Sequence, residues 1–192
     1  MKTISNKKYL VLFLLYIIVG CTQESKSSNQ VTDYYQGFKN SNYDLIRSTI
    51  ADSLVIIEGS QELKFSRESY YSHFKWDSVF QPEYTIKNIT RNNEKILATV
   101  SLRSSRLEFL ENNPLTCTYE FHFKSNKINK IVIVNCDADW KIWQNRRDLL
   151  VNWVKNNYPK YGGFINDLSM DGATNYLKAI SLYKKENLKN TP

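Results

Sequence analysis

The chain has 192 residues, a hydrophobic share of 42% and a formal net charge of +7. This length suffices for one domain with a buried core, and the moderate charge, without a Lys/Arg block or an aromatic RNA-binding motif, argues against nucleic-acid binding. Two histidines and three cysteines without a close cluster argue against a zinc site. No phosphate-binding loop, dinucleotide-binding glycine pattern or Gly-x-Ser-x-Gly motif occurs, so we expect no cofactor.

Residues 1–20 have the layout of a secretory signal peptide. Lys2, Lys7 and Lys8 form a positive head, and an apolar run over residues 9–19 follows directly. This run is shorter than the roughly 20 residues that a helix needs to cross a bilayer. The pattern therefore predicts export by the general secretory route.

The apolar run ends in the sequence Ile18-Val19-Gly20-Cys21. This sequence resembles the lipobox of bacterial lipoproteins, and the resemblance implies cleavage after Gly20 and a lipid on the sulfur of Cys21. The alternative is an ordinary signal peptide with a cysteine near its cleavage site. The lipoprotein interpretation predicts a chain held on a membrane of the cell envelope. Because Thr22 rather than Asp follows the cysteine, we expect the outer membrane rather than the inner one.

The composition then divides the mature chain into three parts. Residues 21–30 are polar and predict a flexible tether. We expect a folded domain over residues 31–136. Residues 137–192 predict a C-terminal helical extension packed on the same domain.

The first half of the domain predicts helices and one strand. Apolar side chains at spacings of three and four indicate a helix over residues 31–38. A short helix over residues 43–50 and a strand over residues 53–58 follow. A third helix begins at residue 66 and is stopped by Pro82.

The second half predicts an antiparallel meander followed by helices. The four strand-like segments, separated by Asn- and Pro-containing turns, cover residues 84–90, 95–107, 116–123 and 128–136. Asp137 or Asp139 can cap the next helix, which Pro159 ends. A final helix carries an apolar stripe made of Ala173, Tyr176, Leu177, Ile180 and Tyr183.

This order of elements predicts an α+β domain with a curved antiparallel sheet wrapped around its N-terminal helices, plus additional C-terminal helices. The order over residues 31–136, with the helix end Trp76…Phe80-Gln81-Pro82 before the meander, resembles the cystatin-like cone fold of nuclear transport factor 2-like, or SnoaL-like, proteins. The resemblance rests on element order. It implies a cone that can hold a ligand, but no position of this chain matches the catalytic residues of the polyketide cyclases and ketosteroid isomerases that it resembles.

Cys117 and Cys136 remain after lipidation of the first cysteine. A two-residue turn near Asn126-Lys127 would place them opposite each other on neighbouring strands, and an exported chain permits a disulfide. A register shift of two residues would instead separate the sulfurs and leave two buried thiols. Both alternatives stay open at this point.

Strand alternation separates two faces on residues 95–107 and 116–123. The predicted core faces consist of Ile96, Ala98, Val100 and Leu102 on one strand and of Cys117, Tyr119, Phe121 and Phe123 on the next. On the other faces, pairing of residue 107 with residue 116 would place Arg103 opposite Glu120 and Ser101 opposite His122. One interpretation is a polar floor with Glu120 or His122 as general base and Arg103 holding an anion. The other, which we favour, is a solvent-facing ion pair.

The third helix carries the other chemically notable side chains. His73 and Asp77 are one turn apart and would form a pair in a pocket, although a surface histidine is the simpler interpretation. Aromatic residues from the helices that close the cone predict either a ligand-binding wall or plain core. The wall would comprise Tyr34, Tyr35, Tyr70, Phe74, Trp76 and Phe80, and we interpret Trp140, Trp143 and Trp153 as packing residues.

These observations favour an envelope-anchored lipoprotein whose cone binds a small apolar or amphipathic ligand, or a protein partner, without catalysis. The expected binding residues are Tyr34, Tyr35, Tyr70, Phe74, Trp76 and Arg103. The first alternative is an isomerase, dehydratase or cyclase, which needs at least two titratable groups within hydrogen-bond reach in the cone. The second is a structural lipoprotein with a filled cone. One expected partner is the membrane, through Cys21. The resemblance to cone-fold proteins also implies a second copy of the chain across the outer sheet face.

Overall fold

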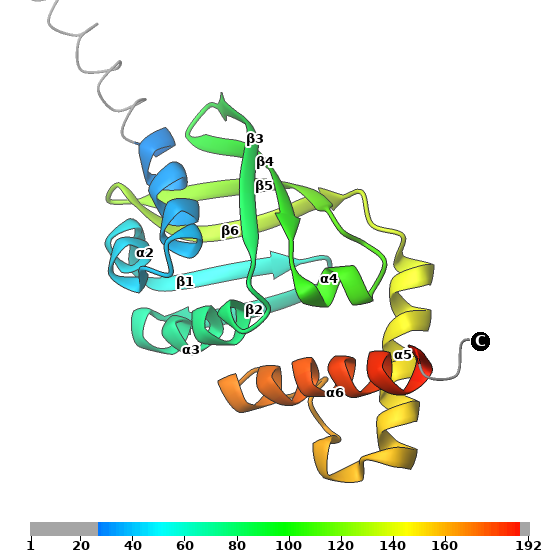
Figure 1. Cartoon of the computed structure of the whole chain (residues 1–192). Coiled ribbons are helices and arrows are strands. Elements are labelled where there is room, and N and C mark those ends of the chain that lie inside the picture. Colours follow the sequence, from blue (N-terminus) through cyan, green and yellow to red (C-terminus); the bar gives the residue numbers. More distant parts are fainter. Residues whose placement is uncertain (1–26, 189–192) are drawn as a thin grey trace, which may run out of the picture.

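The computed structural model describes residues 27–188, which fold around one curved sheet (Figure 1). The predicted signal peptide, Cys21 and residues 21–26 of the predicted tether lie outside the described residues. Within residues 27–188, none of the helices combines the length and the apolar character that crossing a membrane requires.

The sheet has six strands in the order β2-β1-β6-β5-β4-β3. The strands are β1 (Ile50–Glu58), β2 (Gln61–Ser66), β3 (Glu83–Asn92), β4 (Lys95–Arg103), β5 (Leu115–Lys124) and β6 (Lys127–Cys136). Strands β3 to β6 form the predicted antiparallel meander. The sheet as a whole is mixed rather than antiparallel, because β1 pairs with β6 in the parallel direction. The predicted α+β class with a curved sheet around helices is confirmed.

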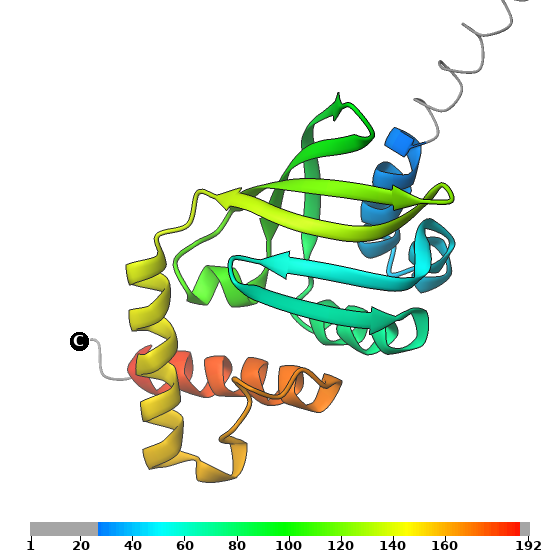
Figure 2. The ribbon, with the colours of Figure 1, turned by 180° about the vertical axis from the view of Figure 1, so that it is seen from behind.

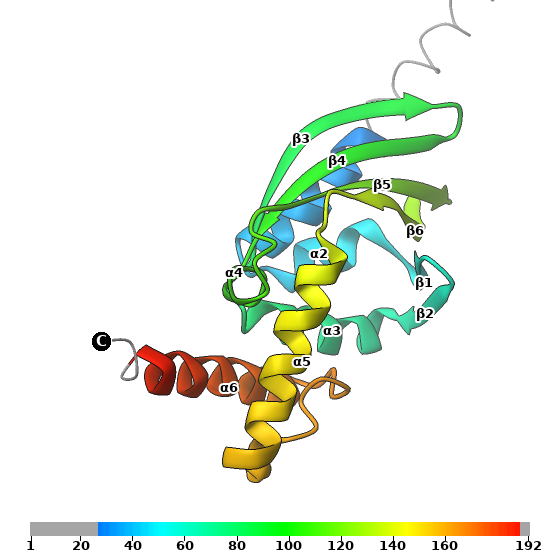
Figure 3. The ribbon, with the colours of Figure 1, turned by 90° about the vertical axis from the view of Figure 1, so that its right-hand side faces the viewer.

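Three helices fill the concave side of the sheet, as the side view in Figure 3 shows. They are the first helix, over residues 27–39, α2 (Tyr43–Thr49) and α3 (Arg67–Ser78). The first helix already includes residues 27–30, so the predicted tether is wrong for its last four residues. Polar residues at a helix start need no apolar periodicity, which is why the tether prediction extended too far.

The main core lies between these helices and the sheet. The buried stripe of the first helix contains Val31, Tyr34, Tyr35 and Phe38, and it packs against Ile46, Leu54, Tyr70, Ile96 and Phe121 among others. The side chains predicted for the core faces of β4 and β5 are buried or half-buried on this side. Burial of these apolar surfaces is the main force that holds the helices inside the curved sheet.

Two elements differ from the prediction in the connection from β4 to β5. Strand β4 ends at Arg103 instead of residue 107, because the Ser104 hydroxyl accepts a hydrogen bond from the Leu107 amide (3.1 Å) and starts the short helix α4 (Ser105–Phe109). The longer connection shifts the register, so that Ser101 faces Thr116. The predicted pairs of Arg103 with Glu120 and of Ser101 with His122 are therefore wrong. The shift amounts to an even number of residues, so every side chain keeps its predicted face.

The hairpin of β5 and β6 turns at Ser125 and Asn126, both with positive φ, 51° and 58°. Lys124 therefore faces Lys127, and an unbroken ladder would place Cys117 opposite residue 134. Two single-residue bulges in β6 move the register by two, so Cys117 faces Cys136 and the two form a disulfide. Of the two alternatives for the cysteines, the structure has the bridged one.

The C-terminal residues form α5 (Trp140–Asn157), a 3₁₀ turn (Pro159–Tyr161) and α6 (Met170–Leu188). Asp139 caps α5 by accepting a hydrogen bond from the Ile142 amide (2.9 Å). Helix α6 runs beneath α3 and crosses α5 (Figure 1). A second core unites these helices with the end of α3 and with α4, and its buried members are Trp76, Phe80, Phe109, Leu110, Leu150, Val154, Phe164, Ala173, Tyr176, Ala179 and Ile180.

Candidate functional site

The helices and the concave side of the sheet enclose a cavity of about 210 Å³, which we call the cone cavity. Its walls come from the first helix, α3, α4 and all six strands, and the start of α5 lies at its rim. The aromatic lining residues are Tyr34, Tyr35, Phe38, Tyr70, Trp76, Tyr84, Tyr119 and Trp140. The charged or titratable ones besides the tyrosines are Glu58, His73, Asp77 and Arg106. The filled cone of the second alternative is therefore not what the structure shows.

The tyrosine wall is tightly packed and uncharged. The hydroxyls of Tyr34 and Tyr70 share a hydrogen bond, and the ring of Tyr35 contacts those of Tyr34 (centroids 5.2 Å apart) and Tyr84 (5.3 Å). Burial raises the pKa of Tyr34, Tyr35, Tyr70 and Tyr84 well above the usual value, so all four are protonated phenols. The wall offers apolar ring faces with a few hydroxyl groups.

Asp77 is the buried carboxyl group of the cone cavity, with 8% of its surface exposed. The Tyr84 hydroxyl donates a hydrogen bond to its Oδ2 atom (2.8 Å). Burial raises the pKa of Asp77, while the hydrogen bond from Tyr84 and the positive charge of Arg106 act in the opposite direction. Asp77 and Tyr84 thus form one pair of titratable groups in direct contact inside the cone.

His73 faces the cavity between aromatic rings. Its imidazole stacks on Tyr70 (5.4 Å) and Trp76 (6.3 Å) and contacts Phe65. Burial, aided by the charge of Arg106, lowers the pKa of His73 to about 4, so the ring is neutral at pH 7. The interpretation as a surface histidine is wrong. The predicted pair with Asp77 is wrong too, since the carboxyl group of Asp77 bonds to Tyr84 and, within residues 27–188, not to His73.

Arg106 of α4 supplies the basic group of the cavity. Its guanidinium lies over the rings of Trp76 (5.0 Å to the centroid) and Phe80 (5.5 Å). Sequence reasoning assigned this anion-holding role to Arg103, which is exposed at the end of β4, faces Glu83 in register and does not line the cavity. The error has one cause: the segment around Arg106 was predicted as a strand. The Ser104-Ser105 pair was the missed signal, because serine is a favoured helix N-cap.

Glu120 and His122 lie on the outer face of the sheet, away from the cavity. The Glu120 carboxylate accepts hydrogen bonds from Lys95 Nζ (2.9 Å) and contacts His122 Nε2 (2.6 Å). The hydrogen bond from Lys95 is the main reason that the pKa of Glu120 is lowered. Their predicted role as a general base in the cone is therefore wrong. The ion-pair interpretation is right for this face, although the partner of Glu120 is Lys95 and not Arg103.

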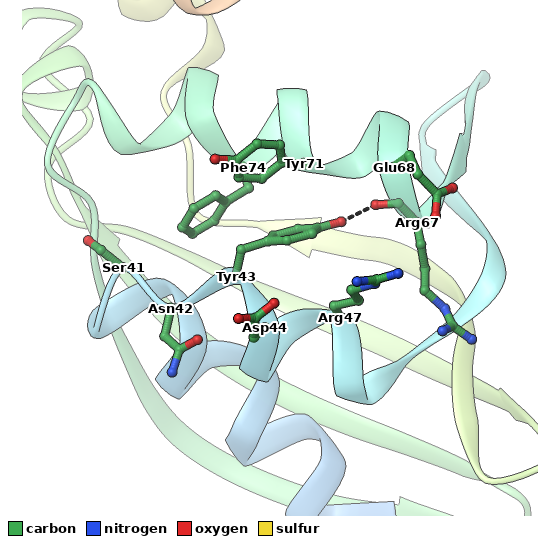
Figure 4. Close-up of a pocket in the computed structure, with 9 residues that line it drawn as sticks. All are labelled: Ser41, Asn42, Tyr43, Asp44, Arg47, Arg67, Glu68, Tyr71 and Phe74. Atoms are coloured by element: carbon green, nitrogen blue, oxygen red, sulfur yellow. Dashed lines mark hydrogen bonds between the residues drawn. The ribbon is translucent and has the colours of Figure 1, made fainter.

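The remaining predicted binding residue, Phe74, lines a different hollow (Figure 4). This groove, of about 600 Å³, lies between α2 and α3 and opens widely to solvent. Tyr43 forms its floor and donates a hydrogen bond from its hydroxyl to the Arg67 carbonyl. Two acidic and two basic residues surround it, and Arg67 is already paired with Asp52. The groove is larger than the cone cavity, but it is more open and is not lined by buried titratable groups. The cone cavity is therefore the candidate site.

Trp140 also differs from the prediction. It was interpreted as a packing residue, but 49% of its surface is exposed and it stands at the rim of the cavity. Trp143 and Trp153 are half-buried and pack against the second core. Tyr84 and Tyr119 are lining residues that were not among the predicted binding residues. Their strand positions carried the signal, because Tyr119 shares the core face of its strand with Cys117 and Phe121.

No protein-family model matches the chain, and no curated protein matches its sequence. Solved structures match its fold. The protein Bal32a, from a soil-derived mobile gene cassette, shares 10% identity and a TM-score of 0.52, covering 64% of this chain and 97% of its own. A candidate polyketide cyclase from Acidithiobacillus ferrooxidans shares 12% identity and a TM-score of 0.51, over 64% and 95% of the two chains. A candidate SnoaL-like polyketide cyclase from Jannaschia sp. CCS1 shares 16% identity over 60% and 86%, with a TM-score of 0.47.

At such identities, the likeness shows the fold alone. The first two matches agree with the cone architecture that the order of elements predicted. The matched regions span nearly all of these two proteins but leave about a third of this chain unmatched. This chain is therefore a cone-fold domain with additional segments.

Proposed function

We propose that this protein is an envelope lipoprotein, anchored through Cys21, whose cone cavity binds a small amphipathic ligand without transforming it. The observation that supports this most is the cone cavity itself, a concave, partly open space with aromatic walls and a few buried polar groups. Small-molecule sites have this character: they are concave, mostly apolar, and oriented by a small number of polar side chains.

The volume limits the size of the ligand. Pockets for drug-sized ligands measure roughly 300–1,000 Å³, and the cone cavity has about 210 Å³. We therefore expect a ligand with the dimensions of one or two fused rings or of a short acyl chain. The neutral phenols and the neutral His73 suit its apolar part, and the group formed by Asp77, Tyr84 and Arg106 suits its polar end.

Binding can be tested by filling the cavity. We would titrate the mature chain, residues 21–192 carrying Cys21→Ser, with 2-naphthol and follow the fluorescence of Trp76 and Trp140, both in the cavity wall. The chain with an unaltered cavity should bind 2-naphthol saturably. Ile133→Phe, which inserts bulk into the cavity, should abolish it. Val134→Phe is the matched control, since Val134 is next to Ile133 in the chain but its side chain is 55% exposed and does not line the cavity. Equal binding by both variants would contradict the proposal.

One observation favours an acid–base enzyme as a second candidate. Asp77 and Tyr84 are two titratable groups in hydrogen-bond contact inside the cone, the minimum that an isomerase, dehydratase or cyclase requires. Against this, His73, with a pKa of about 4, is a weak base at neutral pH. Binding without reaction remains the simpler function for this lining.

The two candidates differ in what Asp77→Asn does to the small molecules that co-purify with the chain. Binding alone predicts the same molecule, identified by mass spectrometry, with the wild type and with the variant. Acid–base catalysis predicts product with the wild type and unreacted substrate with the variant. A substrate–product difference would therefore replace the binding proposal by the enzymatic one.

The lipid anchor is tested independently. The wild-type chain should sediment with membranes and require detergent for release, because several acyl chains hold a protein on a bilayer almost permanently. Cys21→Ser, once the signal peptide is removed, should appear in the soluble fraction with the domain folded. Membrane association of that processed variant would contradict the lipoprotein proposal and leave the cavity proposal untouched.

A further inference from the structure

Arg106 is a half-buried cation at the wall of the cone cavity. It is the one basic residue among the side chains that line the cavity, apart from the neutral His73. Among residues 27–188, no carboxylate lies within ion-pair distance of its guanidinium. Burying a charge without a counter-charge costs free energy. An anion bound in the cavity would therefore offset the free-energy cost of burying the Arg106 charge.

Two aromatic rings also hold the guanidinium in place. Its distances of 5.0 Å and 5.5 Å to the ring centroids of Trp76 and Phe80 place it over both rings. The N–H groups of a guanidinium match the two oxygens of a carboxylate. Helix α4, capped by Ser104, fixes the position of the side chain at its start.

The two carboxyl groups of the cavity do not fill this role. Asp77 is held by the Tyr84 hydroxyl, and burial raises its pKa. Glu58 comes from the end of β1, which β6 and β5 separate from β4, the strand that leads into α4. No ion pair joins it to Arg106 among the described residues. The positive charge of Arg106 nevertheless acts across the cavity, because it lowers the pKa of both His73 and Asp77.

We infer that the ligand of the cone cavity is a monocarboxylic acid, whose carboxylate binds Arg106 and whose apolar part packs on the tyrosine wall. This inference rests on the proposed function. A single carboxylate matches the single available cation. A phosphate, with nearly two negative charges, would leave one of them uncompensated next to Asp77 and Glu58.

Two probes of the same shape test the charge. 2-Naphthoate carries the carboxylate, and 2-naphthamide replaces it by a neutral amide. We expect the Cys21→Ser chain to bind naphthoate at least tenfold more tightly than naphthamide, measured by tryptophan fluorescence at pH 7. Arg106→Gln should remove this preference by weakening naphthoate at least tenfold while changing naphthamide less than threefold. Arg103→Gln is the matched control, because Arg103 is exposed and lies outside the cavity.

The outcomes separate the two claims. Equal affinity of the wild-type side chains for both probes overturns the carboxylate inference and leaves the binding function standing. Binding of neither probe contradicts the proposed function itself. If Arg106→Gln fails to fold, the probe ratio in the parent chain still decides. Arg106→Lys, which keeps the charge but not the flat fork, should then retain part of the preference.

Discussion

Burial shifts the pKa values of two residues in the cone cavity in opposite directions. His73 has its pKa lowered from 6.5 to about 4 and is neutral in the folded state at pH 7. Asp77 has its pKa raised, so its contribution to stability is present below the ordinary pKa of 3.8 and is lost as the pH rises through the folded value. Both shifts disfavour charge on these two side chains, which is the property that the apolar part of the proposed ligand requires.

The lowered pKa of His73 predicts a specific acid sensitivity. The unfolded chain binds a proton near pH 6.5 and the folded chain only near pH 4, so stability is lost as the pH falls between these values. His73→Phe keeps a ring between Tyr70 and Trp76 but cannot titrate. When the pH is lowered from 7 to 4, the variant should therefore lose roughly 2–3 kcal/mol less of its free energy of unfolding than the wild type does. Urea unfolding at several pH values measures this.

The matched control is His122→Gln on the outer face. There the imidazole is half-buried, and its contact with the Glu120 carboxylate opposes the lowering of its pKa by burial. It should change the pH dependence far less than His73→Phe does. An unaltered profile in His73→Phe would show that the histidine titrates normally and is not enclosed as described.

Single residues of the site could be predicted where their element was predicted well. Tyr34, Tyr35, Tyr70 and Trp76 follow from helical spacing, and all four line the cavity. Arg106 was missed, because a helix of five residues in a connection leaves almost no periodic signal and only its serine cap marks it. Which face of the sheet is concave was also not evident. Alternation tells that two faces differ, but curvature depends on the packing of all strands.

At the level of elements, the edge strand β2 shows the same limit. It has only two inward-facing apolar residues, Leu63 and Phe65, among polar neighbours, so its alternation is too short to separate from a loop. By contrast, the start of α3 was predicted to within one residue, since Ser66 is its cap. The cap of α5 was narrowed to Asp137 or Asp139, and its stop at Pro159 was predicted. Hydrogen bonds between residues close in the chain can be predicted from the sequence, whereas pairing between distant segments is harder to predict.

Helix α5 offers a direct test of how the C-terminal extension is attached. Leu150 is fully buried in the second core, while 43% of its neighbour Leu149 is exposed. Leu150→Ala should lower the free energy of unfolding by about 2–4 kcal/mol, because it leaves a cavity. Leu149→Ala should change it by less than about 0.5 kcal/mol. Urea titrations followed by tryptophan fluorescence compare the two, and equal losses would contradict the described orientation of α5.

The disulfide between β5 and β6 should stabilise the hairpin that leads into α5. It joins residues 19 positions apart, and closing a loop of this size in the unfolded chain is worth about 3 kcal/mol in the chain-entropy description. Replacing both Cys117 and Cys136 by Ser should lower the free energy of unfolding by roughly that amount. Reductant should destabilise the wild type similarly and leave the double variant unchanged. A wild type insensitive to reductant would indicate two free thiols.

At the scale of the whole molecule, the helices lie on one side of the sheet. The convex side carries no helix within the described residues, as the rear view in Figure 2 shows. Thr99, Thr118, Glu120 and His122 lie there, half-buried and polar. Such an uncovered face fits the expectation of a homodimer across the outer sheet face, which stays a prediction.

Light scattering of the Cys21→Ser chain at high concentration should give twice the monomer mass. Thr118→Arg, in the middle of this face, should yield the monomer, because two like charges would meet across a twofold axis. Thr174→Arg on the exposed side of α6 is the control and should leave the mass unchanged. A monomeric parent chain would rule out this dimer.

The first helix connects the N-terminal segment that carries Cys21 to the wall of the cone cavity. It enters the described structure at residue 27, at the end far from α5 (Figure 1), and its Tyr34 and Tyr35 form part of the cavity wall. If Cys21 is fixed in a membrane, any pull on the domain passes through this helix before it reaches the sheet. Force and ligand then act on the same side chains: tension would draw the tyrosines out of the wall, and an occupied cavity would resist that extraction.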